Sequence, residues 1–153
     1  MRRVLFALPV LAVLTTVTAC GGGGADVKDA YLVAATNVCE VAKTDTAALK
    51  SSASAADLKQ FVDNSLAIAK RAQSELQQLT PPPDDVAELK TKVLDPFATL
   101  ITQGEAYAAK VTAAGTDQAK LLPLLAEQPK PDGIDLDFLR SYGLPTCADV
   151  IKG

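Results

Sequence analysis

The sequence predicts an all-α domain: an up-down helical bundle of about four main helices plus a short C-terminal helix, with one disulfide. Three observations support this fold class. Apolar residues recur at three- and four-residue steps, no segment alternates apolar and polar residues as a strand does, and clusters of Ser, Pro and Gly separate the apolar stripes. The chain has 153 residues, which is enough for one ordinary domain.

The first two predicted helices are delimited by residues that favour helix ends. The first begins at Asp26, and its apolar stripe comprises Val27, Tyr31, Ala34, Val38 and Val41. A Ser-rich break at residues 51–54 precedes the second helix, in which Ser54 is the predicted N-cap and Asp57 its capping-box partner. Three consecutive prolines at positions 81–83 end the second helix.

The third predicted helix is the longest, and either Asp84 or Asp85 is expected to cap it. Its apolar seam extends over residues 86–111 with the near-heptad spacing of antiparallel bundle packing. Pro96 lies inside this seam, so the sequence predicts either a kink or a division into two segments. Gly115 is the predicted end.

The remaining predicted segments are short. Thr116 is the expected cap of a fourth segment at residues 117–127, and residues 129–133 form a turn or linker. A last helix near residues 135–142 ends at Gly143, because glycine is preferred just beyond a helix end.

The composition excludes several classes of function. The chain contains no histidine, which removes Ser-His, Cys-His and His-metal sites. Its formal net charge of −3 argues against binding to nucleic acid, which requires a basic face. We therefore expect no catalytic residues, no cofactor and no metal site, and the protein is predicted not to be an enzyme.

The N-terminal residues have the features of an export signal. Arg2 and Arg3 precede the apolar run Val4–Val17, whose 14 residues fall short of the roughly 20 that a membrane-spanning helix needs. The following motif, Val17-Thr18-Ala19-Cys20, resembles the lipobox of bacterial lipoproteins. An ordinary secretory peptide with a chance cysteine is the alternative interpretation.

Membership of the lipoprotein family would imply that Cys20 receives a diacylglycerol and acyl chains such as palmitate. It would also imply that residues 1–19 are removed. The expected organisation is a signal peptide at 1–19, lipidated Cys20 with a Gly-rich flexible tether at 20–25, and a helical domain at 26–153. Two acyl chains give stable anchoring, so we expect a location on the extracytoplasmic face of the cell membrane.

Two cysteines remain once Cys20 is assigned to the lipid. Cys39 lies on the first predicted helix and Cys147 follows the last one. Disulfides persist in exported proteins, and two thiols allow one connectivity, so the sequence predicts a Cys39–Cys147 disulfide. A redox-active pair is the rival interpretation, but the chain has no CxxC motif.

The body of the chain also has a recognisable pattern. The Asn37-Val38-Cys39 helix, the Leu79-Thr80-Pro81-Pro82 break and the closing Tyr142-Gly143-Leu144 with Cys147 resemble small exported helical proteins of actinobacteria. The resemblance covers most of the body and implies export, a disulfide and a bundle. It carries over no catalytic residue, because this group has no established activity.

Carboxylate clusters are the remaining candidates for chemistry. Asp132, Asp135 and Asp137 suggest a calcium loop, but the glycine stands second instead of sixth, and the EF-hand order fails. Helix entry with Asp135 near the N-cap is the simpler interpretation.

The sequence therefore favours a binding or accessory module at the cell envelope, attached to the membrane by its lipid and able to bind an envelope protein. The alternative function is a carrier of an apolar small molecule. The Ala-rich seam with Gly104 leaves room for a groove between helices, and the carrier hypothesis predicts a cavity of several hundred Å³. Its expected lining includes Val38, Leu66, Val93 and Tyr107.

Overall fold

The computed structural model describes residues 23–49 and 54–153. Within these ranges the chain is helical and contains no strand, so the all-α prediction is confirmed. The predicted signal peptide, Cys20 and residues 50–53 of the Ser-rich break lie outside the described residues.

Three long helical segments and several short ones make up the described chain. Their bounds are α1 Gly23–Ala47, α2 Ala55–Gln78, α3 Val86–Leu89, η1 Lys90–Leu94, α4 Asp95–Ala114, α5 Gln118–Leu124, η2 Leu125–Glu127, α6 Leu136–Tyr142 and α7 Pro145–Lys152. The π-helical turn η1 joins α3 to α4 without a gap, and η2 is a 3₁₀ turn.

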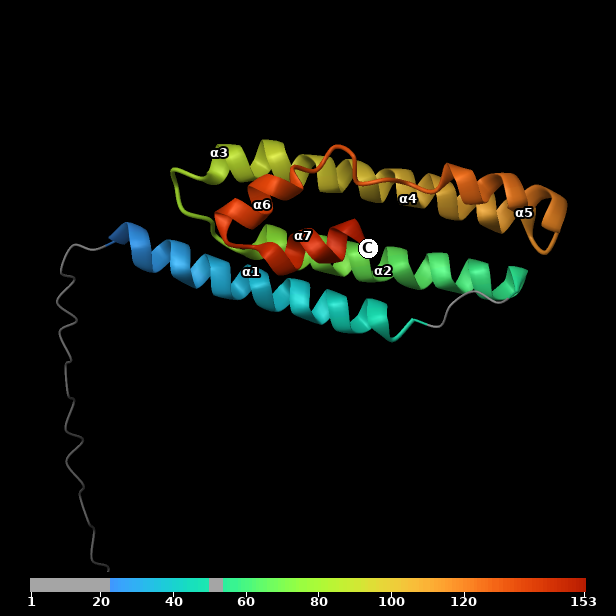
Figure 1. The fold of residues 1–153 in the computed structure, drawn as a ribbon, viewed down its shortest axis with the longest axis horizontal. Helices are drawn as coiled ribbons and strands as arrows, with labels where there is room; N and C mark the ends of the chain where they lie inside the picture. The colour runs from blue at the N-terminus through green and yellow to red at the C-terminus, as the bar shows by residue number, and fades with distance from the viewer. Residues whose placement is uncertain (1–22, 50–53) are drawn as a thin grey trace, which may run out of the picture.

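The long helices lie side by side, and each reverses the direction of the one before it (Figure 1). Helix α2 contacts both α1 and α4. Helices α6 and α7 pack together, and α7 lies against α1, whereas α5 folds back along α4 at the opposite end (Figure 1). The arrangement differs from the prediction in having three long segments, because the expected fourth helix is the short α5 with its 3₁₀ extension.

Pro96 neither divides the third helix nor leaves its backbone unpaired. It occupies the first turn of α4, directly after the π-turn, where a missing N–H is best tolerated. Pro96 has no N–H to donate to the Lys92 carbonyl four residues earlier. That carbonyl accepts a hydrogen bond of 3.0 Å from the backbone N–H of Asp135. The proline thus coincides with the point where the returning chain attaches to the long helix.

Several predicted helix ends are confirmed. The Ser54 side chain accepts a hydrogen bond from the Asp57 N–H at 3.2 Å, and α2 ends at Gln78 before the prolines. Gly115 and Gly143 follow α4 and α6 with positive φ angles of 60° and 106°, which disfavour other residues. Asp135 caps α6 by accepting a hydrogen bond from the Phe138 N–H at 2.8 Å.

Other predicted boundaries are wrong. Helix α1 begins at Gly23, three residues before the predicted start, and includes part of the expected tether. The cap of α5 is Asp117, not Thr116, because the Asp117 side chain accepts a hydrogen bond from the Ala119 N–H. Helix α7 was not predicted; Pro145 supplies its first turn, where proline favours a helix start.

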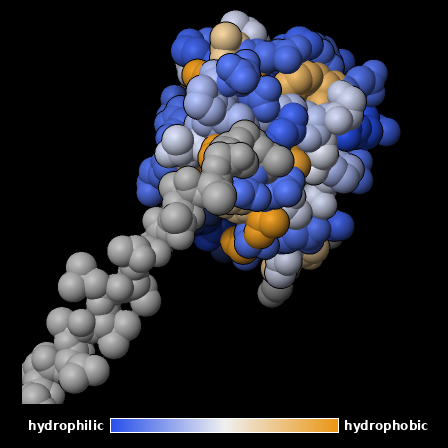
Figure 2. All heavy atoms as spheres, turned by 90° about the vertical axis from the view of Figure 1, so that its left-hand side faces the viewer, coloured by the Kyte–Doolittle hydropathy of each residue, from blue (hydrophilic) through white to orange (hydrophobic). Residues whose placement is uncertain are grey.

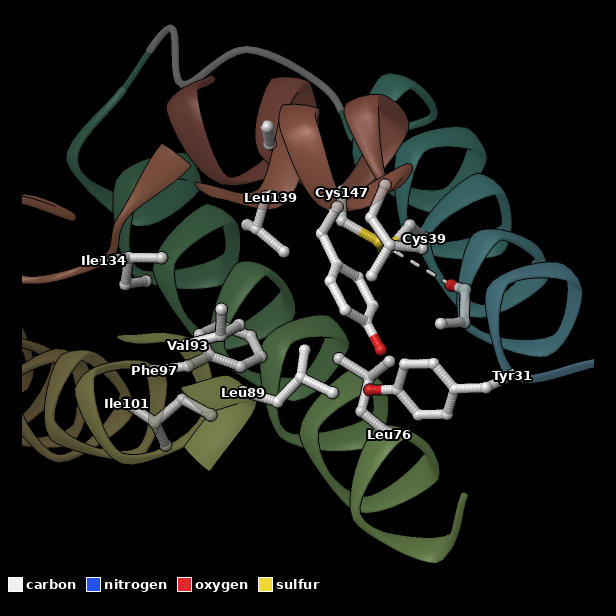
Figure 3. Packing of buried hydrophobic residues seen from close by; sticks show 14 residues of the cluster. Tyr31, Cys39, Leu76, Leu89, Val93, Phe97, Ile101, Ile134, Leu139 and Cys147 are labelled. Atoms are coloured by element: carbon white, nitrogen blue, oxygen red, sulfur yellow. Dashed lines mark hydrogen bonds between the residues drawn. A yellow bond between two sulfur atoms is a disulfide. The ribbon is translucent and has the colours of Figure 1, made fainter. Parts of the chain in front are cut away.

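The larger set of buried residues, here called the main core, fills the space where α1, α2, α3, α4, α6 and α7 meet (Figure 3). Its central side chains include Leu89 and Leu139, each 1% exposed. The predicted disulfide is part of this core and is confirmed: Cys39 of α1 is bonded to Cys147 of α7, with their Cα atoms 5.0 Å apart.

A second set of buried residues, here called the small core, lies at the other end of the long helices. It draws its members from α2, α4 and α5: Leu58, Tyr107, Val111, Ala114, Leu121 and Leu124. Because α1, α6 and α7 contribute none of these residues, the small core has fewer covering elements than the main core.

The end of the domain at which α1 begins is mainly hydrophilic, with apolar residues in small separate patches (Figure 2). None of the helices in the described ranges combines the length and apolarity required for a membrane span.

Candidate functional site

A groove of about 260 Å³ runs between α2 and α4 and is the strongest candidate for a binding site. Helices α2 and α4 supply most of its lining, and two residues after η2 complete it. The lining residues are Leu58, Phe61, Val62, Ser65, Leu66, Ala69, Phe97, Leu100, Ile101, Gly104, Tyr107, Gln128 and Pro129.

The groove follows the boundary between the two cores. Phe97 and Ile101 belong to the main core, whereas Leu58 and Tyr107 belong to the small core. The side chains between these two sets are only partly covered, and Phe61 at the edge is exposed. The hollow thus lies where neither set of helices closes over the α2–α4 seam.

Small residues allow α2 and α4 to approach along this seam. A Cβ atom added at Gly104 would lie 3.2 Å from Leu66 Cδ1, which is closer than ordinary van der Waals contact. Ser65 and Ala69 lie on the facing side of the groove. A larger residue at position 104 would therefore displace Leu66 or occupy the groove.

No charged side chain is among the lining residues of the groove. Its polar side chains are Ser65, Tyr107 and Gln128, and the rest are apolar or glycine. An apolar hollow with a few polar groups is typical of sites for small ligands. A charged ligand group would lose its hydration here without gaining an ionic partner.

Tyr107 is the unusual residue of the groove. It is 6% exposed, and its hydroxyl is buried without a hydrogen-bond partner in the part of the chain that the structure describes. Buried tyrosine hydroxyls usually find a partner, because an unpaired buried polar group costs free energy.

Of the four residues expected to line a carrier cavity, the structure places two in this groove, Leu66 and Tyr107. Val93 is buried in the main core, and Val38 packs against that core. The sequence did not single out Ser65, Phe61 or Gln128 as lining residues. Gln128 follows a turn, and no periodicity could have placed it opposite α2.

Away from the groove, a cluster of three polar side chains links α6 and α1 to the start of α3. The Tyr142 hydroxyl donates a 2.7 Å hydrogen bond to Asp85, and Lys28 Nζ lies 3.4 Å from the same carboxylate. Lys28 Nζ also lies 4.2 Å from the centroid of the Tyr142 ring, within range of a cation–π interaction. Asp85 is the N-cap residue of α3, in agreement with the prediction, but its side chain makes no capping hydrogen bond to the helix.

The hydrogen bond explains the electrostatics of this cluster. It holds the pKa of Asp85 below its ordinary value, with a smaller contribution from Lys28. Burial, and then the bond to Asp85, raises the pKa of Tyr142 above its ordinary value. A tyrosine with a raised pKa stays protonated at neutral pH, so its hydroxyl remains a hydrogen-bond donor that links α6 to Asp85 at the start of α3.

A larger hollow of about 380 Å³ lies beside Pro96, but its lining is mixed and includes Asp95 and Lys130. No group of three Cys, Asp or Glu side chains within residues 23–49 and 54–153 could hold a metal ion. The groove is thus the one hollow in which an apolar lining and an unpaired buried polar group occur together among the described residues.

Comparison with known proteins shows no matching family model, no matching curated protein and no matching solved structure.

Proposed function

We propose that the chain is a non-catalytic binding protein of the cell envelope, held on the outer face of the cell membrane by lipid on Cys20. Its folded part would act as an up-down bundle of long helices that presents the α2–α4 groove as a binding site. The observation that carries this proposal is the uncharged apolar groove with the unpaired Tyr107 hydroxyl.

The motif at residues 17–20 supports the anchor, since it resembles a lipobox and follows a short apolar run. Only two residues separate Cys20 from the start of α1 at Gly23. A lipid on Cys20 would therefore hold the start of α1 close to the membrane. The absence of histidine from the chain supports a non-catalytic function.

A second candidate function is a carrier of an apolar small molecule, and the shape of the groove favours it over a protein partner. Stable protein interfaces bury roughly 1,200–2,000 Å² of total surface, whereas small ligands occupy concave apolar hollows. The groove is concave and confined to the α2–α4 seam and the adjoining residues 128–129.

The anchor is tested with the full chain expressed in a bacterial host, as wild type and as Cys20→Ala. Intact mass and membrane fractionation are measured for both proteins. We expect wild type to gain a mass of diacylglycerol size and to remain with the membrane, and Cys20→Ala to lose both properties. A wild-type product that is unlipidated and released would overturn the anchor and leave a freely secreted carrier as the function.

A further inference from the structure

We propose that the α2–α4 groove takes an uncharged, mainly apolar small molecule that carries a hydrogen-bond acceptor, such as a neutral ester or ketone. The Tyr107 hydroxyl donates a hydrogen bond to this acceptor. The inference rests on the proposed binding function and deepens it by naming the chemistry of the ligand.

The state of the Tyr107 hydroxyl is the first argument. Its oxygen is buried and has no partner among the described residues, although a tyrosine O–H can donate one hydrogen bond and accept others. The structure therefore carries a desolvation cost at this position. A ligand that brings an acceptor into the groove removes that cost, and a purely apolar ligand does not.

One of the two tyrosines of the main core, Tyr142, has a hydrogen-bond partner for its hydroxyl. Tyr142 is also buried, and its hydroxyl donates to Asp85 at 2.7 Å. The same chain thus provides a built-in acceptor for one buried tyrosine and none for Tyr107 within the described residues. The difference coincides with the groove, which Tyr107 lines and Tyr142 does not.

The lining sets the charge and size of the ligand. With no charged side chain in the groove, a ligand carboxylate or ammonium would be desolvated without compensation, so the ligand is uncharged. A volume of about 260 Å³ lies just below the usual range of roughly 300–1,000 Å³ for ligand pockets, which suits one small molecule. A whole two-chain membrane lipid is too large.

Access to the hydroxyl requires a local movement. The Tyr107 oxygen is inaccessible to solvent, so the acceptor of the ligand reaches it only when Tyr107 or a neighbouring side chain moves. The groove is open to solvent on its outer side, where Phe61 and Gln128 are exposed. We therefore expect the ligand to enter at this edge.

The test uses a matched pair of photoreactive probes with the full chain in isolated membranes. One probe is a straight-chain methyl ester and the other is an alkane of the same length; both carry a diazirine in the chain. Cross-linked peptides are mapped by mass spectrometry in wild type, Tyr107→Phe, Ser65→Leu and Ala67→Leu. Ser65→Leu fills the groove, whereas Ala67→Leu adds the same side chain at an exposed position of α2.

We expect the ester to label α2 and α4 at the groove about tenfold more strongly than the alkane. Tyr107→Phe should reduce ester labelling to the level of the alkane and leave alkane labelling unchanged. Ser65→Leu should abolish labelling by both probes, and Ala67→Leu should have no effect. Retention of folded protein in each variant is checked by circular dichroism.

Three unfavourable outcomes have different meanings. Equal labelling of the groove by both probes, unaffected by Tyr107→Phe, would overturn the role of the hydroxyl but leave the groove as a binding site. No labelling of the groove by either probe would overturn the proposed binding function itself. Labelling that persists in Ser65→Leu would place the bound probe outside the groove and overturn the inference as well.

Discussion

A buried tyrosine at each end of the domain differs in the hydrogen bonding of its hydroxyl. At the end where α1 begins, Tyr142 donates a hydrogen bond to Asp85 and stacks against Phe138, with ring centroids 5.3 Å apart. At the other end, Tyr107 has the same side chain and a similar burial, but its hydroxyl is unpaired among the described residues.

The two ends also differ in the number of helices that cover the core. Six α-helices and the π-turn η1 contribute to the main core, which includes the disulfide, whereas three helices form the small core. The difference shows that more helices cover the core at one end, and that an open apolar groove remains where the two cores meet. Binding sites are drawn from the less closed parts of a fold, because a ligand needs space that packing would otherwise fill.

Among the substitutions that test this comparison, removal of the disulfide should cause the largest loss of stability. Cys39 and Cys147 are 108 residues apart in sequence, and a loop of that length corresponds to a stabilisation of about 4–5 kcal/mol in the chain-entropy model. Cys39→Ala with Cys147→Ala should therefore lower the melting temperature strongly in thermal unfolding followed by circular dichroism. Reductant should lower the wild-type value similarly and leave the double variant unchanged. A wild-type melting temperature that is insensitive to reduction would contradict the role of the disulfide as a staple.

Replacement of Tyr142, the paired tyrosine, should cause a smaller loss of stability, and this loss should depend on pH. Tyr142→Phe removes the hydrogen bond to Asp85 and should lower the free energy of unfolding by less than loss of the disulfide. In wild type, the raised pKa of Tyr142 gives stability that is present below its ordinary value of 10.0 and is lost as the pH rises above it. The lowered pKa of Asp85 gives stability that is present above its ordinary value of 3.8 and is lost as the pH falls through the folded-state pKa.

Chemical denaturation of wild type and Tyr142→Phe across this pH range measures both contributions. The difference between the two proteins should be greatest near neutral pH and should shrink toward both extremes. Asp85→Asn keeps an acceptor for the Tyr142 hydroxyl and serves as the matched control, with a smaller loss expected. A difference that stays constant from acid to alkaline pH would contradict the assigned role of the pair.

Replacement of the unpaired tyrosine should change the free energy of unfolding least. It should raise this free energy, whereas the other two replacements lower it. Tyr107→Phe removes a buried hydroxyl that has no partner among the described residues, so we expect the free energy of unfolding to rise by about 1 kcal/mol. Urea denaturation of Tyr107→Phe and Tyr142→Phe side by side checks this contrast between the two ends. A clear loss of stability in Tyr107→Phe would show that the hydroxyl is satisfied in solution.

The sequence was most informative where the responsible residues are local. Ser54, Gly115 and Gly143 mark helix ends through their own side chains or backbone freedom, and the structure confirms all three. The pairing of Cys39 with Cys147 was also predictable, because the assignment of Cys20 to the lipid left one connectivity.

Local rules failed where a distant partner decides the outcome. Asp85 has the sequence context of a helix cap, but Tyr142, 57 residues away, uses its carboxylate. Choosing between Thr116 and Asp117 required the actual path of the chain, since both residue types cap helices. Gly104 in the apolar seam indicated a possible groove between helices. The unpaired state of the Tyr107 hydroxyl depends on every neighbouring side chain, so no sequence pattern predicts it.

The hydrogen bond from Asp135 to Lys92 provides a local reporter of folding. The donor belongs to the cap of α6 and the acceptor to the π-turn before α4, so the bond exists only while the returning segment is attached to the long helix. Hydrogen exchange of the Asp135 amide therefore measures the detachment of the start of α6 from the long helix, while the disulfide still joins α7 to α1. A proline that leaves one carbonyl free has thus given the start of α6 its own observable opening step.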